Sequence, residues 1–78
     1  MHFCKKVSEL NPGQEGIIEM LFQEGCSHLQ LQEMGILPGR NIRLTRRAPM
    51  GTPFQVDVEG CAFLLSNDEA AAVLVRVN

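Results

Sequence analysis

A chain of 78 residues leaves room for one domain, so we expect residues 1–78 to form a single folded unit. Hydrophobic residues make up 45% of the chain and charged residues 21%, the usage of an ordinary globular protein. The net charge of −2 gives the chain as a whole no electrostatic reason to approach nucleic acid or anionic lipid. The three cysteines are odd in number and form no C-x-x-C pair, which argues against a secreted disulfide framework. No stretch approaches a signal peptide or the roughly 20 apolar residues of a membrane span, so we expect a cytoplasmic protein without direct membrane insertion.

Glycine and proline recur along the chain and divide it into short segments, a pattern typical of a small barrel rather than a helix bundle. The first predicted strand covers residues 17–22. This segment is rich in β-forming residues and apolar on both parities, so the pattern does not decide which of its side chains face the core.

Residues 27–34 carry the one strong helical signal, which predicts a helix of about two turns. Ser27 fits the first position of a capping box, and Gly35 fits the left-handed position that follows a helix end. We expect the helix to lie across the mouth of the barrel and to bury Leu31 and Met34 there.

Three alternating segments follow, at 41–47, 54–58 and 61–65, and each predicts a strand with one inward face. The parity of the first segment places three residues on the outer face: Arg43, Thr45 and Arg47. The parity of the last segment places three residues on the inner face: Cys61, Phe63 and Leu65. Glu59-Gly60 predicts a tight turn between the last two strands, with a positive φ at the glycine.

Residues 67–71 indicate a single helical turn with Asn67 as its cap, and the alternating valines of 73–77 predict the final strand. The fold class is therefore mainly β: a five-stranded SH3-like barrel, closed on itself, with one short α-helix after the first strand and a helical turn before the last. An OB-fold also has five strands, but its helix usually falls between the third and the fourth.

Four arginines make the only local concentration of positive charge: Arg40, Arg43, Arg46 and Arg47. A run of this kind is commonly a solvated strand face, and the functional alternative is a docking patch for an acidic protein surface or for the phosphates of a partner's nucleotide. Nucleic acid is not an expected partner, because the chain has no Trp or Tyr for base stacking and its net charge is negative.

Cysteine and histidine supply the candidate metal ligands. Cys26 and His28 lie close together in the sequence, as do His2 and Cys4, but a divalent metal needs three or four ligands that converge. Cysteine is among the residue types most often buried, so we interpret the thiols as buried and predict no resident metal or other cofactor. Cys26 and His28 are the candidate ligands if a transition metal binds adventitiously.

Groups suited to catalysis are few. The two histidines offer little choice of a general base, and no G-x-x-x-x-G-K-[ST] loop is present to hold a nucleotide. The sequence therefore predicts a binding protein and not an enzyme.

Three motifs in order resemble the ferrous iron transport protein A (FeoA) family: GILPG at 35–39, RAPMGTP at 47–53 and DEA at 68–70. The resemblance covers nearly the whole chain. It implies a small cytoplasmic SH3-like protein that accompanies a large ferrous iron permease with a GTP-binding domain, of the FeoB type, and docks onto its cytoplasmic part. The implied function is an accessory or regulatory role in bacterial ferrous iron uptake, with recruitment to the inner face of the membrane by this partner.

The docking surface is predicted where the helix and the 49–53 loop flank the barrel, together with the arginines. A glycine between two prolines makes this loop stiff, so little conformational entropy is lost when it binds. The predicted contact residues are Leu37, Arg43, Arg46, Arg47, Pro49, Met50, Gly51 and Pro53. A related barrel occurs in iron-dependent repressors, so the alternative function is a metal-sensing or repressor-like module that binds a transition metal ion. The oligomeric state is left open.

Overall fold

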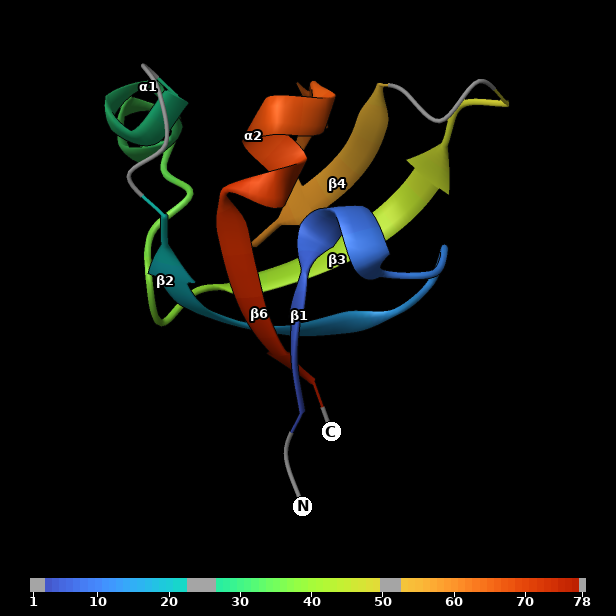
Figure 1. The fold of residues 1–78 in the computed structure, drawn as a ribbon, viewed down its shortest axis with the longest axis horizontal. Coiled ribbons are helices and arrows are strands. Elements are labelled where there is room, and N and C mark those ends of the chain that lie inside the picture. Colours follow the sequence, from blue (N-terminus) through green and yellow to red (C-terminus); the bar gives the residue numbers. More distant parts are fainter. Residues whose placement is uncertain (1–2, 23–26, 50–52, 78) are drawn as a thin grey trace.

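A computed structural model describes residues 3–22, 27–49 and 53–77 of the chain (Figure 1). Within this part, six strands, two short α-helices and one 3-10 helix follow one another. In chain order they are β1 (Phe3–Lys6), η1 (Val7–Glu9), β2 (Glu15–Leu21), α1 (Ser27–Glu33), β3 (Asn41–Arg47), β4 (Phe54–Val58), β5 (Cys61–Leu65), α2 (Asn67–Ala71) and β6 (Val73–Val77).

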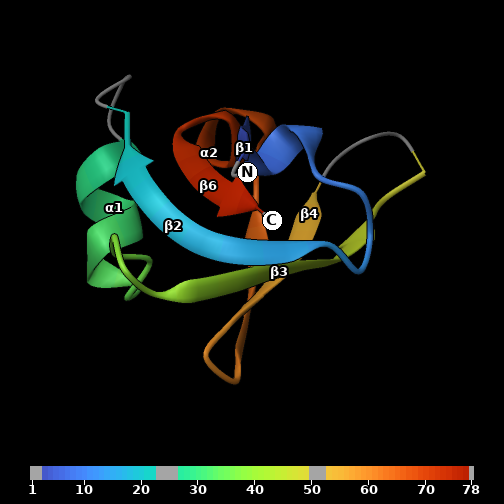
Figure 2. The same ribbon diagram turned by 90° about the horizontal axis from the view of Figure 1, so that it is seen from below.

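The strands form one antiparallel sheet in the order β1-β6-β2-β3-β4-β5. β2 and β3 sweep across the molecule as long curved strands, and the turn between β4 and β5 projects away from the rest (Figure 2). Within the described residues, β1 and β5 each pair with one neighbour and not with each other. The prediction of a barrel closed by its own strands is therefore wrong, and the sheet is curved but open.

The predicted count of five strands is also wrong, because β1 was missed. Its sequence, Phe-Cys-Lys-Lys, has no alternation and two lysines, so no local pattern indicates a strand. β1 forms because β6 offers a partner along its whole length, from Phe3 opposite Val77 to Lys6 opposite Leu74. The main helix consequently follows the second strand, whereas α2 precedes the last strand as predicted.

The core lies inside the curve of the sheet and is almost entirely aliphatic. Each of its fully buried Leu, Ile and Val side chains contributes roughly 1.5–3 kcal/mol to stability by leaving water. The largest of them are Val7, Leu10, Ile18, Leu31, Ile36, Ile42, Leu44, Val56, Leu65, Val73 and Val75. α2 and its C-cap residue cover part of this core with the small side chains of Ala70 and Ala72, which are completely buried. Their small size lets a short helix pack closely against the sheet.

Local predictions around the helices are confirmed in most respects. Leu31 is fully buried and Met34 packs half-buried against the core, while Gly35 adopts the left-handed conformation with φ +93°. The cap of α2 is Ser66 and not Asn67 as predicted, because Ser66 accepts a hydrogen bond from the backbone N–H of Glu69. A serine and an asparagine side by side are equally good caps in the sequence, and only the geometry separates them.

The inward parity of β5 is only partly confirmed. Leu65 is buried and Phe63 is half-buried against the core, but Cys61 is exposed, contrary to prediction. Cys61 lies on an edge strand next to the projecting turn, so no neighbouring strand covers it on one side. Cys4 is exposed as well, so the interpretation of the thiols as buried is wrong for both cysteines that the structure describes.

A β-bulge at Thr45 changes the parity of β3. Leu44 lies opposite Val56, yet Arg46 lies opposite Gln55, so one extra residue separates the two pairs. Beyond the bulge, the side chain of Arg46 lies on the outer face of the sheet, as that of Arg43 does. The side chain of Arg47 lies on the other side, toward its buried partner Phe54. The prediction that Arg43 and Arg47 share one parity is therefore wrong.

Candidate functional site

The outer side of β3, β4 and β5 carries a candidate site, which we call the β3–β5 face. Two cross-strand rows run over it, and each begins with an arginine on β3. The residues that define this face are Arg43, Asp57 and Ala62 in one row, and Arg46, Gln55 and Leu64 in the other. Because residues directly opposite on one face lie close together, each row is a continuous strip of contacting side chains.

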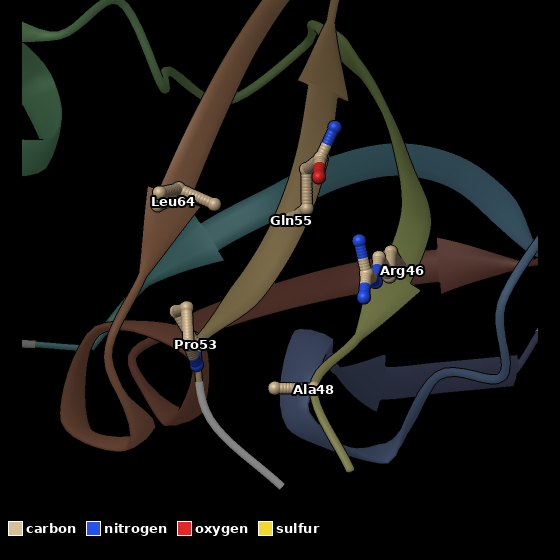
Figure 3. A pocket seen from close by; sticks show the side chains of 5 residues that line it. All are labelled: Arg46, Ala48, Pro53, Gln55 and Leu64. Atoms are coloured by element: carbon tan, nitrogen blue, oxygen red, sulfur yellow. The ribbon is translucent and has the colours of Figure 1, made fainter.

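A pocket of about 220 Å³ opens on the second row. It is lined by Arg46, Ala48, Pro53, Gln55 and Leu64 (Figure 3). The side chains of Arg46, Gln55 and Leu64 project from three neighbouring strands toward the same side of the sheet. The pocket thus combines one cationic group with a largely apolar lining.

A second hollow of about 270 Å³ adjoins the first along β5. Its lining consists of Gln55, Ala62, Phe63 and Leu64, so the two hollows share Gln55 and Leu64. Leu64 lines both hollows and leaves 63% of its surface exposed. A large aliphatic side chain in this position gains free energy whenever a partner covers it.

The two outward arginines differ in their charge environment. Arg43 lies 3.9 Å from the carboxylate of Asp57, and both side chains are partly exposed, so this ion pair adds at most about 1 kcal/mol to stability. No carboxylate within the described ranges forms an ion pair with Arg46. Arg46 can therefore offer its guanidinium to a carboxylate from a partner.

Arg47 is engaged within the molecule. Its Nη2 donates hydrogen bonds to the carbonyl oxygens of Ser8, at 3.0 Å, and Leu10, at 2.6 Å. The guanidinium carbon also lies 5.3 Å from the centroid of the Phe54 ring, within reach of a cation–π interaction. Arg47 thus fastens the end of β3 to η1 and to Leu10, the residue that follows it.

The other predicted contact residues are spread over the molecule. Leu37 is half-buried just before β3, and Pro49 is exposed just after it, so the seven residues of β3 separate them by about 20 Å. Figures 1 and 2 both show β3 beginning near α1 and ending on the opposite side. The structure therefore brings Arg43, Arg46 and Pro53 toward the β3–β5 face but leaves Leu37 at the far end of β3. Met50 and Gly51 lie outside the described residues.

Sequence reasoning missed Gln55, Ala62 and Leu64 as residues of the site. A signal for Leu64 was present, because it is a large aliphatic residue on the outward parity of its predicted strand. Such a residue has no core to enter, and it points to a binding surface where it lies beside other exposed apolar residues.

Metal ligands do not gather in the part of the chain that the structure describes, where no group of three or more His, Cys, Asp or Glu side chains comes together. Of the predicted candidates, Cys26 lies outside the described residues, as does the side chain of His28. No helix in residues 3–22, 27–49 or 53–77 is long and apolar enough to cross a membrane.

The chain resembles several solved structures along most of its length. An iron uptake regulatory protein described as FeoA has 30% identity and a TM-score of 0.84, over 95% of this chain and 97% of that one. Iron(II) transport protein A from Clostridium thermocellum has 33% identity and a TM-score of 0.86, over 94% of this chain and 45% of that one. FeoA from Stenotrophomonas maltophilia, solved with zinc and described as an SH3 domain protein, has 27% identity and a TM-score of 0.79, over 91% and 88%.

A manganese-dependent transcriptional repressor is similar in fold alone, with a TM-score of 0.88 and 14% identity over the whole of this chain and 44% of that one. No match is found among the curated proteins. The family model of the FeoA domain matches residues 5–77, which is nearly the entire chain. The protein is thus a member of the FeoA family, SH3-like proteins associated with ferrous iron transport.

Proposed function

We propose that this protein is an accessory and regulatory protein of bacterial ferrous iron uptake that binds the cytoplasmic part of a GTPase-containing ferrous iron permease. Family membership supports the link to iron transport. The Stenotrophomonas relative is described as a candidate activating factor for ferrous iron transport, which supports a regulatory role. In this proposal the protein is an adaptor without catalytic activity, and its partner recruits it to the inner face of the membrane.

The observation that carries this proposal is the pocket on the β3–β5 face, where Arg46 and the exposed Leu64 lie on either side of Gln55. Binding sites for proteins commonly combine an apolar centre with a charged group at the rim. A partner segment that carries an aliphatic side chain and an acidic residue would cover Leu64 and pair with Arg46. Such a segment is the docking element that we expect on the permease.

Arg46 and Leu64 should contribute to binding in different ways. Rim charges mainly accelerate association, and salt screens them over about 8–10 Å at ordinary ionic strength. Burial of an apolar side chain mainly slows dissociation and depends little on salt. Replacement of Arg46 should therefore reduce the salt dependence of binding, whereas replacement of Leu64 should weaken binding at every salt concentration.

The test is a titration of the purified protein against the cytoplasmic domain of the permease, with and without GTP, at low and moderate salt. Arg46→Ala and Leu64→Ser should each weaken binding by about tenfold, which corresponds to roughly 1.4 kcal/mol. Arg40→Ala and Leu29→Ser are matched controls, because both residues are exposed and lie outside the β3–β5 face. Equal binding by all four variants, or no binding by the native protein under any of these conditions, would contradict the proposal.

The alternative function, a metal-sensing module, draws on the zinc complex of the Stenotrophomonas relative. An anaerobic titration with ferrous iron in a calorimeter separates it from the adaptor. Stoichiometric binding that disappears in Cys26→Ser and His28→Ala would favour the sensor, and the absence of heat would remove it.

A further inference from the structure

β5 is an unprotected edge of the sheet. Within the described residues it pairs with β4 alone. Its sequence, Cys-Ala-Phe-Leu-Leu, contains no charge and no proline, although natural proteins usually place one of these on a free edge to prevent pairing with another chain. An edge of this kind is suited to accept another strand.

The turn that precedes β5 determines which of its backbone groups are free. Glu59 and Gly60 both have positive φ, at 49° and 92°, as the two central residues of a type I′ hairpin turn do. The closing pair of such a turn, Val58 and Cys61, is hydrogen bonded, and bonded pairs then alternate with non-bonded ones along the ladder. The backbone N–H and C=O groups of Ala62 and Leu64 therefore point away from β4.

The side chains of the same two residues are also accessible. Ala62 and Leu64 are exposed and lie on the outer side of the sheet, opposite Asp57 and Gln55. Phe63 lies between them on the inner side and is only half-buried. Backbone and side chains at the centre of β5 are thus available to one and the same partner strand.

We propose that β5 pairs antiparallel with β5 of a second copy of this chain, about a twofold axis that passes beside Phe63. This register places Ala62 opposite the partner subunit's Leu64, and Leu64 opposite the partner subunit's Ala62. Those are the residues whose backbone groups point outward, so both pairs become hydrogen-bonded pairs of the new ladder. Phe63 faces its counterpart in the intervening non-bonded pair, where side chains approach most closely and aromatic pairs are favourable.

The charges on the outer face are compatible with this register. The row Arg43, Asp57, Ala62 continues into the partner subunit's Leu64, Gln55 and Arg46. Aliphatic residues meet aliphatic residues at the axis, and two strands on each side separate the arginines from it. The same patch serves both copies, as a twofold interface requires.

Self-pairing suits β5 better than a foreign strand does. One twofold operation gives hydrogen-bonded positions, apolar contacts and the aromatic pair together, without any feature beyond this chain. The contact is small, so a weak equilibrium between monomer and dimer is expected. This inference does not rest on a permease, although Leu64 takes part in both contacts, so its test is the association of the purified protein alone.

Sedimentation of the purified protein over a wide concentration range tests the association. The native mass should rise from the 8.7 kDa of one chain toward twice that value. Leu64→Lys should abolish the rise, because two lysines would then enter the interface. Leu29→Lys is the matched control, since Leu29 is 68% exposed on α1 and should not affect association. A native protein that stays monomeric throughout, or a Leu64→Lys variant that associates normally, would overturn the inference.

A cysteine cross-link tests the register itself. In a chain with Cys4, Cys26 and Cys61 replaced by Ser, Phe63→Cys brings two thiols together at the axis, where the Cα spacing of about 4.5 Å lies within disulfide range. Ala62→Cys is the control, because its counterpart would be about 8 Å away and too far for a disulfide. Rapid formation of a covalent dimer by Phe63→Cys alone is expected. Cross-linking of Phe63→Cys that is no faster than that of Ala62→Cys, with both variants folded by circular dichroism, would refute the register.

Discussion

The two edge strands of the sheet, β1 and β5, lead into a short helix in the same manner. β1 runs into η1, where the backbone N–H of Lys6 donates to Glu9 at 2.8 Å. β5 runs into α2, where the backbone N–H of Ser66 donates to Glu69, also at 2.8 Å. In both cases a glutamate three residues further along satisfies a donor at the helix start.

The same two strands differ in how they face a further strand. β1 has four residues, two of them lysines, and the ammonium group of Lys6 lies 5.6 Å from the centroid of the Phe22 ring. β5 has five residues and no charge. Because lysines on an edge discourage pairing, we expect β1 to accept another chain less readily than β5 does. The topology creates two edges, and the side chains decide which of them is usable.

The largest expected effect concerns β2, where the half of the sheet that contains β1 and β6 meets the half that contains β3, β4 and β5. Gly16 lies opposite Ile42 of β3, next to the point where β2 begins to pair with β6. A Cβ at Gly16 would overlap the carbonyl oxygen of Arg76 and come within 2.7 Å of Cγ1 of Val75. Gly16→Ala should therefore lower the free energy of unfolding by about 3 kcal/mol.

Urea denaturation of Gly16→Ala measures this loss. Gly39→Ala is the control, because Gly39 has φ +93° but nothing within 4 Å of an added Cβ, so backbone strain alone should cost about 1 kcal/mol. Similar losses in the two variants would contradict the close approach of the Gly16 backbone to Arg76 and Val75.

The next largest effect is a difference in stability between variants of two neighbouring arginines, Arg46 and Arg47. Arg47→Ala removes two hydrogen bonds that fasten β3 to η1 and to Leu10, and it should destabilise the protein by about 2 kcal/mol. Arg46→Ala should change stability by less than about 0.5 kcal/mol, because its side chain points to solvent. Thermal unfolding of both variants tests this difference, and equal shifts of the midpoint would contradict the roles that the bulge at Thr45 gives them.

The two helix starts provide a smaller contrast. Ser66→Ala removes the side-chain half of a reciprocal capping pair, since Ser66 Oγ accepts from the N–H of Glu69 at 3.2 Å, and should cost about 1 kcal/mol. Glu9→Ala removes a single exposed hydrogen bond and should cost about 0.5 kcal/mol. Urea unfolding under one set of conditions ranks them, and the reverse order would mean that the edge at β1 depends more on its helix than the edge at β5 does.

The smallest expected effect concerns the protection of β1. In a Leu64→Lys background that blocks β5, replacement of Lys5 and Lys6 by Thr should leave stability nearly unchanged and create weak association through β1. Sedimentation at high concentration measures it. A variant that stays monomeric would show that Lys5 and Lys6 are not what prevents β1 from pairing with another chain.

Strands with strict alternation were predictable from the sequence, and those shaped by a distant partner were not. β4 and β6 alternate cleanly because one side of each faces the core. β1 has no such pattern and owes its existence to β6. The bulge at Thr45 has no signature in the sequence, because a single extra residue leaves the composition of a strand unchanged.

The candidate site was predictable to a similar degree. The positive charge of Arg43 and Arg46 and the outward parity of Leu64 can be read from the sequence. The pocket that joins Arg46 to Leu64 depends on the register of three strands, which no local pattern specifies. Leu37 was assigned to the same surface although the predicted strand at 41–47 lies between Leu37 and the 49–53 loop, so this separation could have been read from the sequence.

The pairing of β1 with β6 has a consequence for the order of folding. Phe3 lies opposite Val77, so this ladder forms only when almost the entire chain has been drawn into a loop, at an entropic cost that local contacts avoid. The hairpin of β4 and β5 needs a turn of only two residues and can form early. We expect substitutions in β1 to accelerate unfolding and leave the refolding rate unchanged, whereas substitutions in the hairpin slow refolding. The strand that the sequence pattern does not reveal is thus the one that we expect to join the native structure last.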